Sequence, residues 1–299
     1  MHSLIGEFAA LSAAMLWAFA SVLFTTVGKR IGPFNLNAIR MAIGSLLLLV
    51  THYFLSGSFF PSVSNIQFFY LAVSGIIGLA MGDFTYFGVL ILIGPRKTTL
   101  IYSMAPIFSL IGGYFILMEM PSLLSLLGVF LVLIGVWIVI IEREGEEEEE
   151  RNKIKGVLLG ITATASQGIG VVISKYGMLE IGNPVEPISA TLIRIVVATA
   201  VIWIALLLWK RPQDIIRTFQ DTYAMKLTIL ASFIGPFLGL WFSMISINYA
   251  QVGIASTLMS LTPVMIIPVM YFLYGEKTNA RGILGAIIAV VGVAMIFLF

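Results

Sequence analysis

The chain contains no cysteine, only two histidines and few charged residues. Without cysteine there are no disulfides, no thiolate chemistry and no cysteine-ligated metal, and two histidines are too few for a histidine-based metal centre. Charged residues form 11% of the sequence, whereas they form about a quarter of a soluble domain. A net charge of +2 provides no basic face for nucleic acid. We therefore expect no metal, no cofactor and no nucleic-acid partner.

Apolar residues dominate the sequence instead. They make up 59% of it, and the mean hydropathy is +1.03. They run in blocks of about twenty residues, the length that a helix needs to cross a hydrocarbon core of ~30 Å. The N-terminus has neither a basic segment nor an A-x-A cleavage site, so the first block is expected to be a retained span. The composition predicts an all-α, multi-pass protein of the lipid bilayer.

Polar residues, glycine and proline divide the apolar sequence into separate blocks. We predict ten transmembrane helices, at residues 5–27, 35–54, 67–93, 98–118, 121–141, 154–176, 187–209, 224–250, 253–274 and 279–299.

The two halves of the chain resemble each other. Arg40 in "AIRMA" matches Arg194 in "LIRIV" at an offset of 154 residues. An offset of 157 residues then aligns a longer series of pairs: Gly82 with Gly239, Ser103 with Ser260, Pro106 with Pro263, Glu119 with Glu276, Gly128 with Gly285 and Gly135 with Gly292. Each half holds five predicted spans. Because five is odd, the two copies enter the membrane in opposite orientations, which predicts two inverted five-helix repeats, residues 1–141 and 154–299.

A charged segment, "EREGEEEEERNK" at residues 142–153, joins the two repeats. Its five consecutive glutamates repel one another and stay hydrated, so the segment cannot enter the bilayer. We interpret it as an acidic linker. Cation binding and contact with a partner are the alternatives.

Several motifs recur in order along both halves. They are "ALSAAMLW" at residues 10–17 and "VLLGITATAS" at residues 157–166, an arginine early in the second span of each half, S-x-x-P in each fourth span, and glycine-rich fifth spans. In this order the sequence resembles the EamA-type members of the drug/metabolite transporter superfamily. The resemblance implies export, or less often import, of amino acids and other small metabolites. It does not identify the substrate.

Other functions compete with this interpretation. A nucleotide-sugar or sugar-phosphate antiporter is the nearest alternative, although it favours more basic residues inside the spans. An intramembrane enzyme is disfavoured, because HExxH, GxSxG and an acid-rich prenyl-diphosphate motif are absent from the sequence. A channel or a membrane assembly protein is a further alternative. Without a Walker A motif, ATP hydrolysis is excluded, so we expect proton-coupled secondary transport by alternating access.

Duplicated prolines point to a substrate site. Pro106 and Pro263 fall inside the fourth and ninth predicted spans, where a proline frees a backbone carbonyl and breaks the helix. Breaks at equivalent places in two repeats indicate a transporter binding site, although a simple packing kink is the alternative. Ser103 and Ser260, three residues earlier, are expected either to satisfy a freed backbone group or to face the cavity.

Three charged residues lie inside the predicted spans. Arg40 and Arg194 are expected to bind the substrate, for example a carboxylate, or to extend their guanidinium groups to the headgroup region. Asp83 lies near the centre of the third span, and its repeat partner is Leu240. We expect Asp83 to couple protons, to act as counter-ion for Arg40, to bind a cationic substrate or to be a neutral hydrogen-bonded acid.

Further residues are expected near the site or at its margins. Amphipathic side chains that could line a substrate cavity are Trp17, Tyr86, Tyr102, Gln167 and Trp241. The acids at span ends, Glu7, Glu119 and Glu276, are expected to be solvated. Glycines seven residues apart in the fifth and tenth spans favour close helix packing, within the chain or in a homodimer.

The distribution of lysine and arginine predicts the orientation. Fourteen of these residues lie beside span ends on one side of the membrane, and only Lys175 lies near a span end on the side that carries both termini. The positive-inside rule therefore predicts a plasma-membrane protein with both termini outside. The resemblance implies cytoplasmic termini. For this sequence we expect the orientation given by the lysine and arginine count, with both termini outside.

Overall fold

The computed structural model describes residues 2–142, 153–209, 218–275 and 280–298, and within these ranges every regular element is a helix. In the first half the chain forms α1 (His2–Ile31), α2 (Pro33–Ser56), α3 (Asn65–Gly75), the π-helix η1 (Ile76–Met81), α4 (Gly82–Tyr102), α5 (Ala105–Leu117) and α6 (Leu123–Glu142). An all-helical fold is therefore confirmed. The linker predicted at residues 142–153 lies, apart from its two ends, outside the described residues.

The second half follows a similar order, with an additional π-helix, η3, and with two helices, α11 and α12, where the first half has α4. Its elements are α7 (Lys153–Lys175), the π-helix η3 (Tyr176–Glu180), α8 (Pro187–Trp209), α10 (Thr222–Ser232), the π-helix η4 (Phe233–Gly239), α11 (Leu240–Tyr249), α12 (Val252–Met259), α13 (Thr262–Tyr274) and α14 (Ala280–Leu298).

Local signals explain where several helices begin and end. Gly32 (φ 80°) precedes Pro33, which occupies the first turn of α2, and Gly57 (φ 71°) ends that helix in a left-handed conformation. Ser64 and Gln67 form a capping box at the start of α3. Polar turn residues therefore divide the apolar blocks.

Among the described residues, nine helical stretches are long and apolar enough to cross a membrane, and α5 is a shorter apolar helix. The predicted span at residues 98–118 accounts for the difference. Its first residues continue α4, and the chain breaks at Ser103 and Met104 before α5 begins. Pro106 lies in the first turn of α5, where its missing N–H does least harm to the helix.

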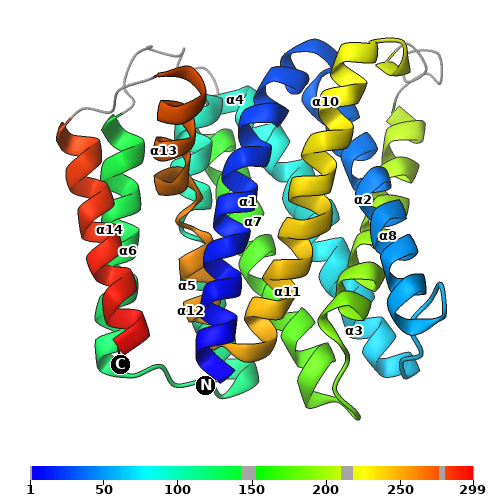
Figure 1. The fold of residues 1–299 in the computed structure, drawn as a ribbon, viewed down its shortest axis with the longest axis horizontal. Coiled ribbons are helices and arrows are strands. Elements are labelled where there is room, and N and C mark those ends of the chain that lie inside the picture. Colours follow the sequence, from blue (N-terminus) through cyan, green and yellow to red (C-terminus); the bar gives the residue numbers. More distant parts are fainter. Residues whose placement is uncertain (1, 143–152, 210–217, 276–279, 299) are drawn as a thin grey trace.

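The helices of the two halves interleave. In Figure 1, α1 begins at the end of the molecule that carries both termini, whereas α7 begins at the opposite end. The helix α1 packs mainly against α10, η4, α11, α12 and α13. The helix α7 packs against α3, η1, α4 and α5. The helix α2 packs on α8, and α6 packs on α14. Each first helix therefore lies against the other half of the chain.

Glycines bring α6 and α14 into close contact. A Cβ atom added to Gly135 would lie 2.5 Å from the carbonyl oxygen of Gly285, and one added to Gly128 would lie 2.7 Å from that of Gly292. Contacts this short leave no room for any side chain. All four glycines thus serve packing within one chain.

Helical irregularities recur at equivalent places in the two halves. At the offset of 157 residues, the π-helix η1 coincides with the π-helix η4, and the break after Tyr102 coincides with the break after Met259. Tight i to i−3 hydrogen bonds close both breaks, from Met104 to Ile101 and from Leu261 to Leu258. One side of each π-helix packs against helices of the other half, η1 against α7 and α8 and η4 against α1 and α2, and the other side is exposed.

Candidate functional site

A buried ion pair joins α2 to α4. The side chain of Arg40 is 7% exposed, and its Nη2 donates to Oδ2 of Asp83 at 2.5 Å. Its Nε donates to Oδ1 of Asn37, one helical turn earlier, at 2.9 Å. A charged pair inside a membrane-spanning bundle is tolerated only where the partners satisfy one another. The guanidinium therefore faces inward and does not extend to the headgroup region.

Aromatic side chains surround the same guanidinium. The carbon Cζ of Arg40 lies 5.1 Å from the ring centroid of Phe24, 5.8 Å from that of Phe87 and 6.0 Å from that of Trp17. The faces of aromatic rings attract cations, and the rings keep the site dry. Trp17 also covers Gly235 and Gly239 of η4, so the cluster includes both halves of the chain.

Two predicted tyrosines and one serine continue this region along α4. The rings of Tyr86 and Tyr102 meet edge to face with centroids 4.8 Å apart. Tyr86 is three residues from Asp83, on the same side of the helix. At the break, the Oγ atom of Ser103 accepts a hydrogen bond of 3.1 Å from the indole nitrogen of Trp137. The structure thus places Trp17, Arg40, Asp83, Tyr86 and Tyr102 in adjoining positions.

The remaining predicted residues of the second half do not join this group. Ser260 donates to the carbonyl of Thr257 within its own helical turn, at 2.7 Å. Pro263 begins α13 after the second break, as Pro106 begins α5. Trp241 packs beside Phe237, and Gln167 on α7 is half-buried. These side chains have separate neighbours and do not surround a common charged residue.

Arg194 differs from Arg40 in its partners. It is 2% exposed, and its Nη1 donates to the sulfur of Met244 at 2.9 Å. Its Nε is buried without a hydrogen-bond partner. Within the described residues no carboxylate pairs with it. The second arginine is thus buried without a counter-ion.

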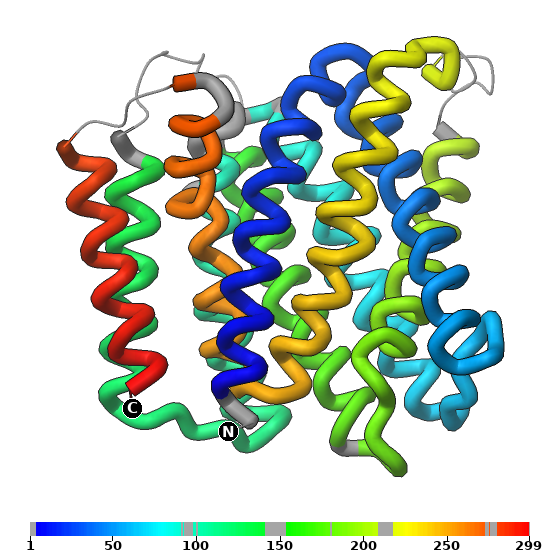
Figure 2. The backbone as a smooth tube through the Cα atoms, in the orientation of Figure 1, coloured from blue at the N-terminus to red at the C-terminus, as the bar shows by residue number. Residues whose placement is uncertain are grey.

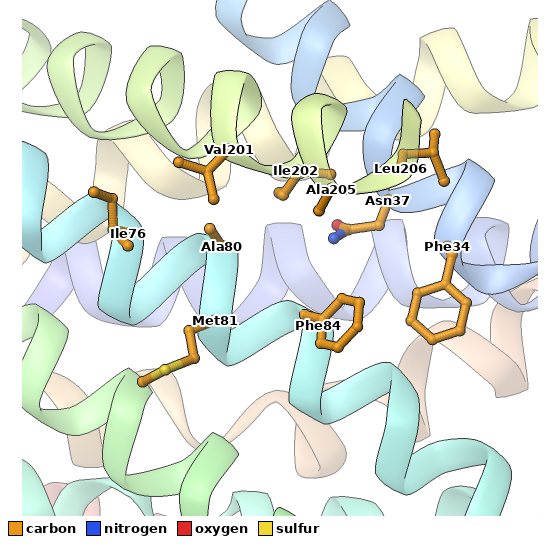
Figure 3. A pocket seen from close by; sticks show the side chains of 10 residues that line it. All are labelled: Phe34, Asn37, Ile76, Ala80, Met81, Phe84, Val201, Ile202, Ala205 and Leu206. Carbon is orange, nitrogen blue, oxygen red and sulfur yellow. The ribbon is translucent and has the colours of Figure 1, made fainter. Parts of the chain in front are cut away.

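An apolar cavity of about 220 Å³ lies beside the ion pair, between α2, η1, α4 and α8. Nine of its ten lining residues are apolar, and Asn37 is the exception. Figure 3 shows the amide of Asn37 pointing into the space between α8 and α4. The same amide accepts the bond from Arg40. The cavity can therefore hold an apolar group next to a polar one.

Part of the cavity lining also belongs to the exposed surface of the bundle. Ile76, Met81 and Phe84 line the cavity and are themselves exposed, within a stretch long and apolar enough to span a membrane. One side of the cavity is therefore bordered by exposed apolar side chains.

A second ion pair was not foreseen in the sequence. Glu119 was expected to be solvated, but its Oε1 lies 2.6 Å from Nζ of Lys175, and its Oε2 accepts from the backbone N–H of Val252 at 2.6 Å. Lys175 also donates to the carbonyl of Ala250 at 2.5 Å. The expectation was wrong because the turn after α5 folds against the ends of α7 and α11. The backbone segments that this network joins, the turn after α5 and the ends of α7 and α11, lie at the end of the bundle that carries the termini (Figure 2).

The other acids at span ends have separate outcomes. Glu7 was also expected to be solvated, but it is buried in α1, and its Oε2 has no hydrogen-bond partner. The short residues around the α1–α11 contact explain this, since Gly6 lies directly against Ala250 and leaves no room for water. Glu276 lies outside the described residues.

Sequence reasoning missed Asn37, Phe24, Phe87 and the three π-helices. Asn37 could have been found, because it lies three residues before Arg40 and therefore on the same side of one helix. Pro236, which lies inside η4, gives a signal for one π-helix. The segment "IIGLAM" of η1 contains no comparable residue.

Comparison with known proteins identifies the family. The model of the EamA-like transporter family matches residues 4–141 and residues 154–298. A relative described as "Uncharacterized transporter YoaV" of Bacillus subtilis (strain 168) is 29% identical over 140 residues, or 45% of this chain and 46% of the relative. The chain thus matches about half the length of that relative. A crystal structure with 17% sequence identity has a TM-score of 0.80, covering 99% of this chain and 96% of its own, which shows likeness of fold alone. Because the family model covers nearly all of the sequence, the chain belongs to the EamA-like transporter family of multi-pass membrane proteins.

Proposed function

We propose that the protein exports small metabolites, amino acids or related compounds, by alternating access. The duplicated irregular helices carry this proposal, because η1 and η4, and the breaks before Pro106 and Pro263, occupy equivalent positions in the two halves of the chain. Irregular backbone at membrane depth is tolerated where it lines a cavity or is covered by protein. In transporters, interrupted helices at corresponding places of two repeats form the substrate site.

The repeats are proposed to be inverted five-helix units, residues 1–141 and 154–299, joined by the acidic linker. The opposite directions of α1 and α7 support this. The hydroxyl groups of Ser45 and Thr199, which are equivalent at the offset of 154 residues, lie 2.8 Å apart where α2 packs on α8. Equivalent residues touch in this way beside a two-fold axis. Rocking of one unit against the other would then expose the centre alternately.

Asp83 is proposed to couple transport to protons. It already holds Arg40 through a hydrogen-bonded ion pair. A proton that binds to Asp83 neutralises the carboxylate and weakens its attraction to the guanidinium, so protonation loosens α2 from α4. Asn37 and the adjoining cavity then become available to a substrate with a polar and an apolar part. We propose that the ion pair of Glu119 and Lys175 limits access from the termini end.

The protein is proposed to lie in the plasma membrane with both termini outside. Basic residues follow this arrangement, since Arg30 ends α1, Lys226 lies near the start of α10 and Arg281 lies near the start of α14, all at the end opposite to the termini. The positive-inside rule makes that end cytoplasmic. A homodimer would need a surface other than the glycine stripe of α6 and α14, which is covered within the chain.

A nucleotide-sugar or sugar-phosphate antiporter is the second candidate. The unpaired charge of Arg194 favours it, because such substrates carry phosphate. Counterflow of a labelled sugar phosphate against the same compound inside vesicles would distinguish exchange from proton-driven export.

Flux through the purified protein in proteoliposomes tests the leading proposal. A metabolite screen with and without a pH gradient is expected to reveal saturable transport that the gradient accelerates. Asp83→Asn should keep the protein folded and abolish the response to the gradient, and Arg40→Ala should reduce the flux itself. Flux that neither saturates nor responds to pH would argue against a coupled carrier.

A further inference from the structure

Arg194 is a buried cation whose hydrogen bonds are incomplete. It lies in α8 and is 2% exposed. Its Nη1 donates to the sulfur of Met244, a weak acceptor, and its Nε is buried with no partner. A guanidinium has five N–H donors, so most of its hydrogen-bonding capacity is unused here.

The equivalent arginine of the first half shows what is missing. At the offset of 157 residues, Asp83 corresponds to Leu240 and Phe87 to Met244. In the first half, Arg40 contacts both of these residues, the carboxylate of Asp83 and the ring of Phe87. Arg194 keeps the contact with Met244, but a leucine stands where the carboxylate would be. The two repeats therefore place one balanced and one unbalanced arginine in corresponding positions.

An unbalanced charge at this depth is unfavourable to the folded protein. The effective penalty for burying an ion is several kcal/mol, and it is offset only by a close counter-charge and hydrogen bonds. Ionisable residues inside membrane spans mark substrate and ion pathways for this reason. A mobile anion would provide the missing counter-charge.

Small residues allow neighbouring backbone to approach the guanidinium closely. A Cβ atom added to Gly78 of η1 would lie 3.3 Å from Nη2 of Arg194 and 3.3 Å from the Cα atom of Gly170 on α7, closer than an ordinary contact. The site thus lies between α8, η1, α7 and α11, where elements of both halves meet. Substrates of inverted-repeat transporters bind between the halves.

We propose that Arg194 binds the oxyanion group, a carboxylate or phosphate, of the transported metabolite. The planar guanidinium offers two parallel N–H groups to two oxygens, and Nε with a neighbouring nitrogen provides such a pair. This inference rests on the proposed transport function and specifies the class of substrate. Arg40 cannot serve equally, because Asp83 already neutralises it.

The test measures binding by thermal unfolding of the purified full-length protein at constant ionic strength. The probes are benzoate, phenyl phosphate and benzamide, which share one ring and differ in charge. Benzoate or phenyl phosphate is expected to raise the melting temperature with saturation, and benzamide is not. Stabilisation by benzoate alone assigns a carboxylate site, and stabilisation by phenyl phosphate alone assigns a phosphate site. Equal effects of benzamide and both anions would overturn the proposal.

Three variants locate the binding. Arg194→Met should weaken anion binding by about 10- to 100-fold, as expected when a charge-assisted hydrogen bond is lost. Without any probe it should melt at a higher temperature than the wild type, because an apolar side chain of similar length replaces an unbalanced charge. Gly78→Ala keeps the charge but places a Cβ atom 3.3 Å from Nη2 of Arg194, so it crowds the guanidinium and should weaken binding too. Lys226→Met removes an exposed cation and should leave anion affinity unchanged.

The outcomes separate this inference from the proposed function. Anion binding that is unchanged in Arg194→Met, or an Arg194→Met protein that melts lower than the wild type at every probe concentration, would overturn the anion site and indicate a structural arginine. If the wild type transports neutral metabolites in vesicles but binds neither anion, the transport proposal stands and this inference fails. If anions bind at Arg194 but no solute is carried, the transport proposal fails instead.

Discussion

At the scale of single residues, the buried cations of the bundle differ in how many partners balance their charge. Arg40 has a carboxylate, an amide and three rings around it. Lys175 has a carboxylate and a carbonyl. Arg194 has one sulfur. Removing one member of a complete ion pair should therefore lower the stability of the folded protein, whereas removing the unbalanced Arg194 should raise it.

Arg40→Met is expected to destabilise the protein, since it leaves Asp83 buried without its counter-charge. Breaking a buried pair from one side costs about 3–5 kcal/mol. Replacing both partners, as Arg40→Met with Asp83→Asn, should recover most of the loss. Unfolding in a series of denaturant concentrations gives both values. A double variant that is no more stable than the single one would contradict the pairing.

Lys175→Met tests the ion pair and hydrogen bond that Lys175 makes at the termini end of the bundle. The change leaves Glu119 without its cation and the carbonyl of Ala250 without its donor, and unpaired buried groups cost about 1–3 kcal/mol each. We expect a lower melting temperature and faster labelling of a cysteine introduced at Gln251. Lys175→Arg, which keeps the charge, is the control and should label close to the wild-type rate.

The sequence allowed the candidate residues to be named, but it did not predict the side chains that surround them. Asp83 was recognised as an acid deep within a span, and its roles as counter-ion or proton carrier could be named. The pairing of Glu119 with Lys175 could not be foreseen, since it depends on how a turn folds over two other helices. For the same reason the lack of a partner at Arg194 is visible only in three dimensions.

At the scale of helices, glycine and proline decide how closely and how regularly the segments pack. The glycines of α6 and α14 permit backbone contact between two long, apolar helices. Prolines begin α5 and α13 after the two breaks. The predicted helices followed from the apolar blocks, and the breaks followed from the prolines. The π-helix η1 did not, because a wide turn in a Gly-containing apolar segment has no characteristic residue.

A pair of alanine substitutions tests the α6–α14 contact. Gly135→Ala would place Cβ 2.5 Å from backbone atoms of Gly285 and Ala289, which must move apart, at a cost of about 1–3 kcal/mol. Gly88→Ala is the matched control, since nothing lies within 4 Å of the added atom. It should stabilise α4 slightly, by up to about 1 kcal/mol. Thermal unfolding of both variants is the measurement, and equal melting temperatures would contradict the packing described.

At the scale of the whole molecule, both termini lie at one end, and the basic last turn of α1 lies at the other (Figure 1). The all-helical, multi-pass character could be expected from the apolar blocks, whereas the ten predicted spans compare with nine long apolar stretches among the described residues, and the inverted repeat stays a prediction. The way in which each half packs against the other could not be expected, because an offset aligns residues without saying which of them touch.

The absence of native cysteine makes the orientation directly measurable. Ser62→Cys, in the loop after α2, lies at the termini end, and Thr222→Cys, at the start of α10, lies at the opposite end. An impermeant maleimide added to intact cells is expected to label Ser62→Cys and not Thr222→Cys. After the membrane is permeabilised, both should react. The reverse pattern in intact cells would place the termini in the cytoplasm.

The interleaving of the halves also concerns how the protein is made. Most partners of α1 lie in α10 through α13, about 190 or more residues further along the chain, and a ribosome adds about 5–20 residues per second. For many seconds of synthesis, α1 is already in the bilayer with its glycine and alanine face covered by lipid or by the insertion machinery. The first half of the chain therefore cannot complete its packing before the second half is made, and the two halves assemble after α1 has been inserted.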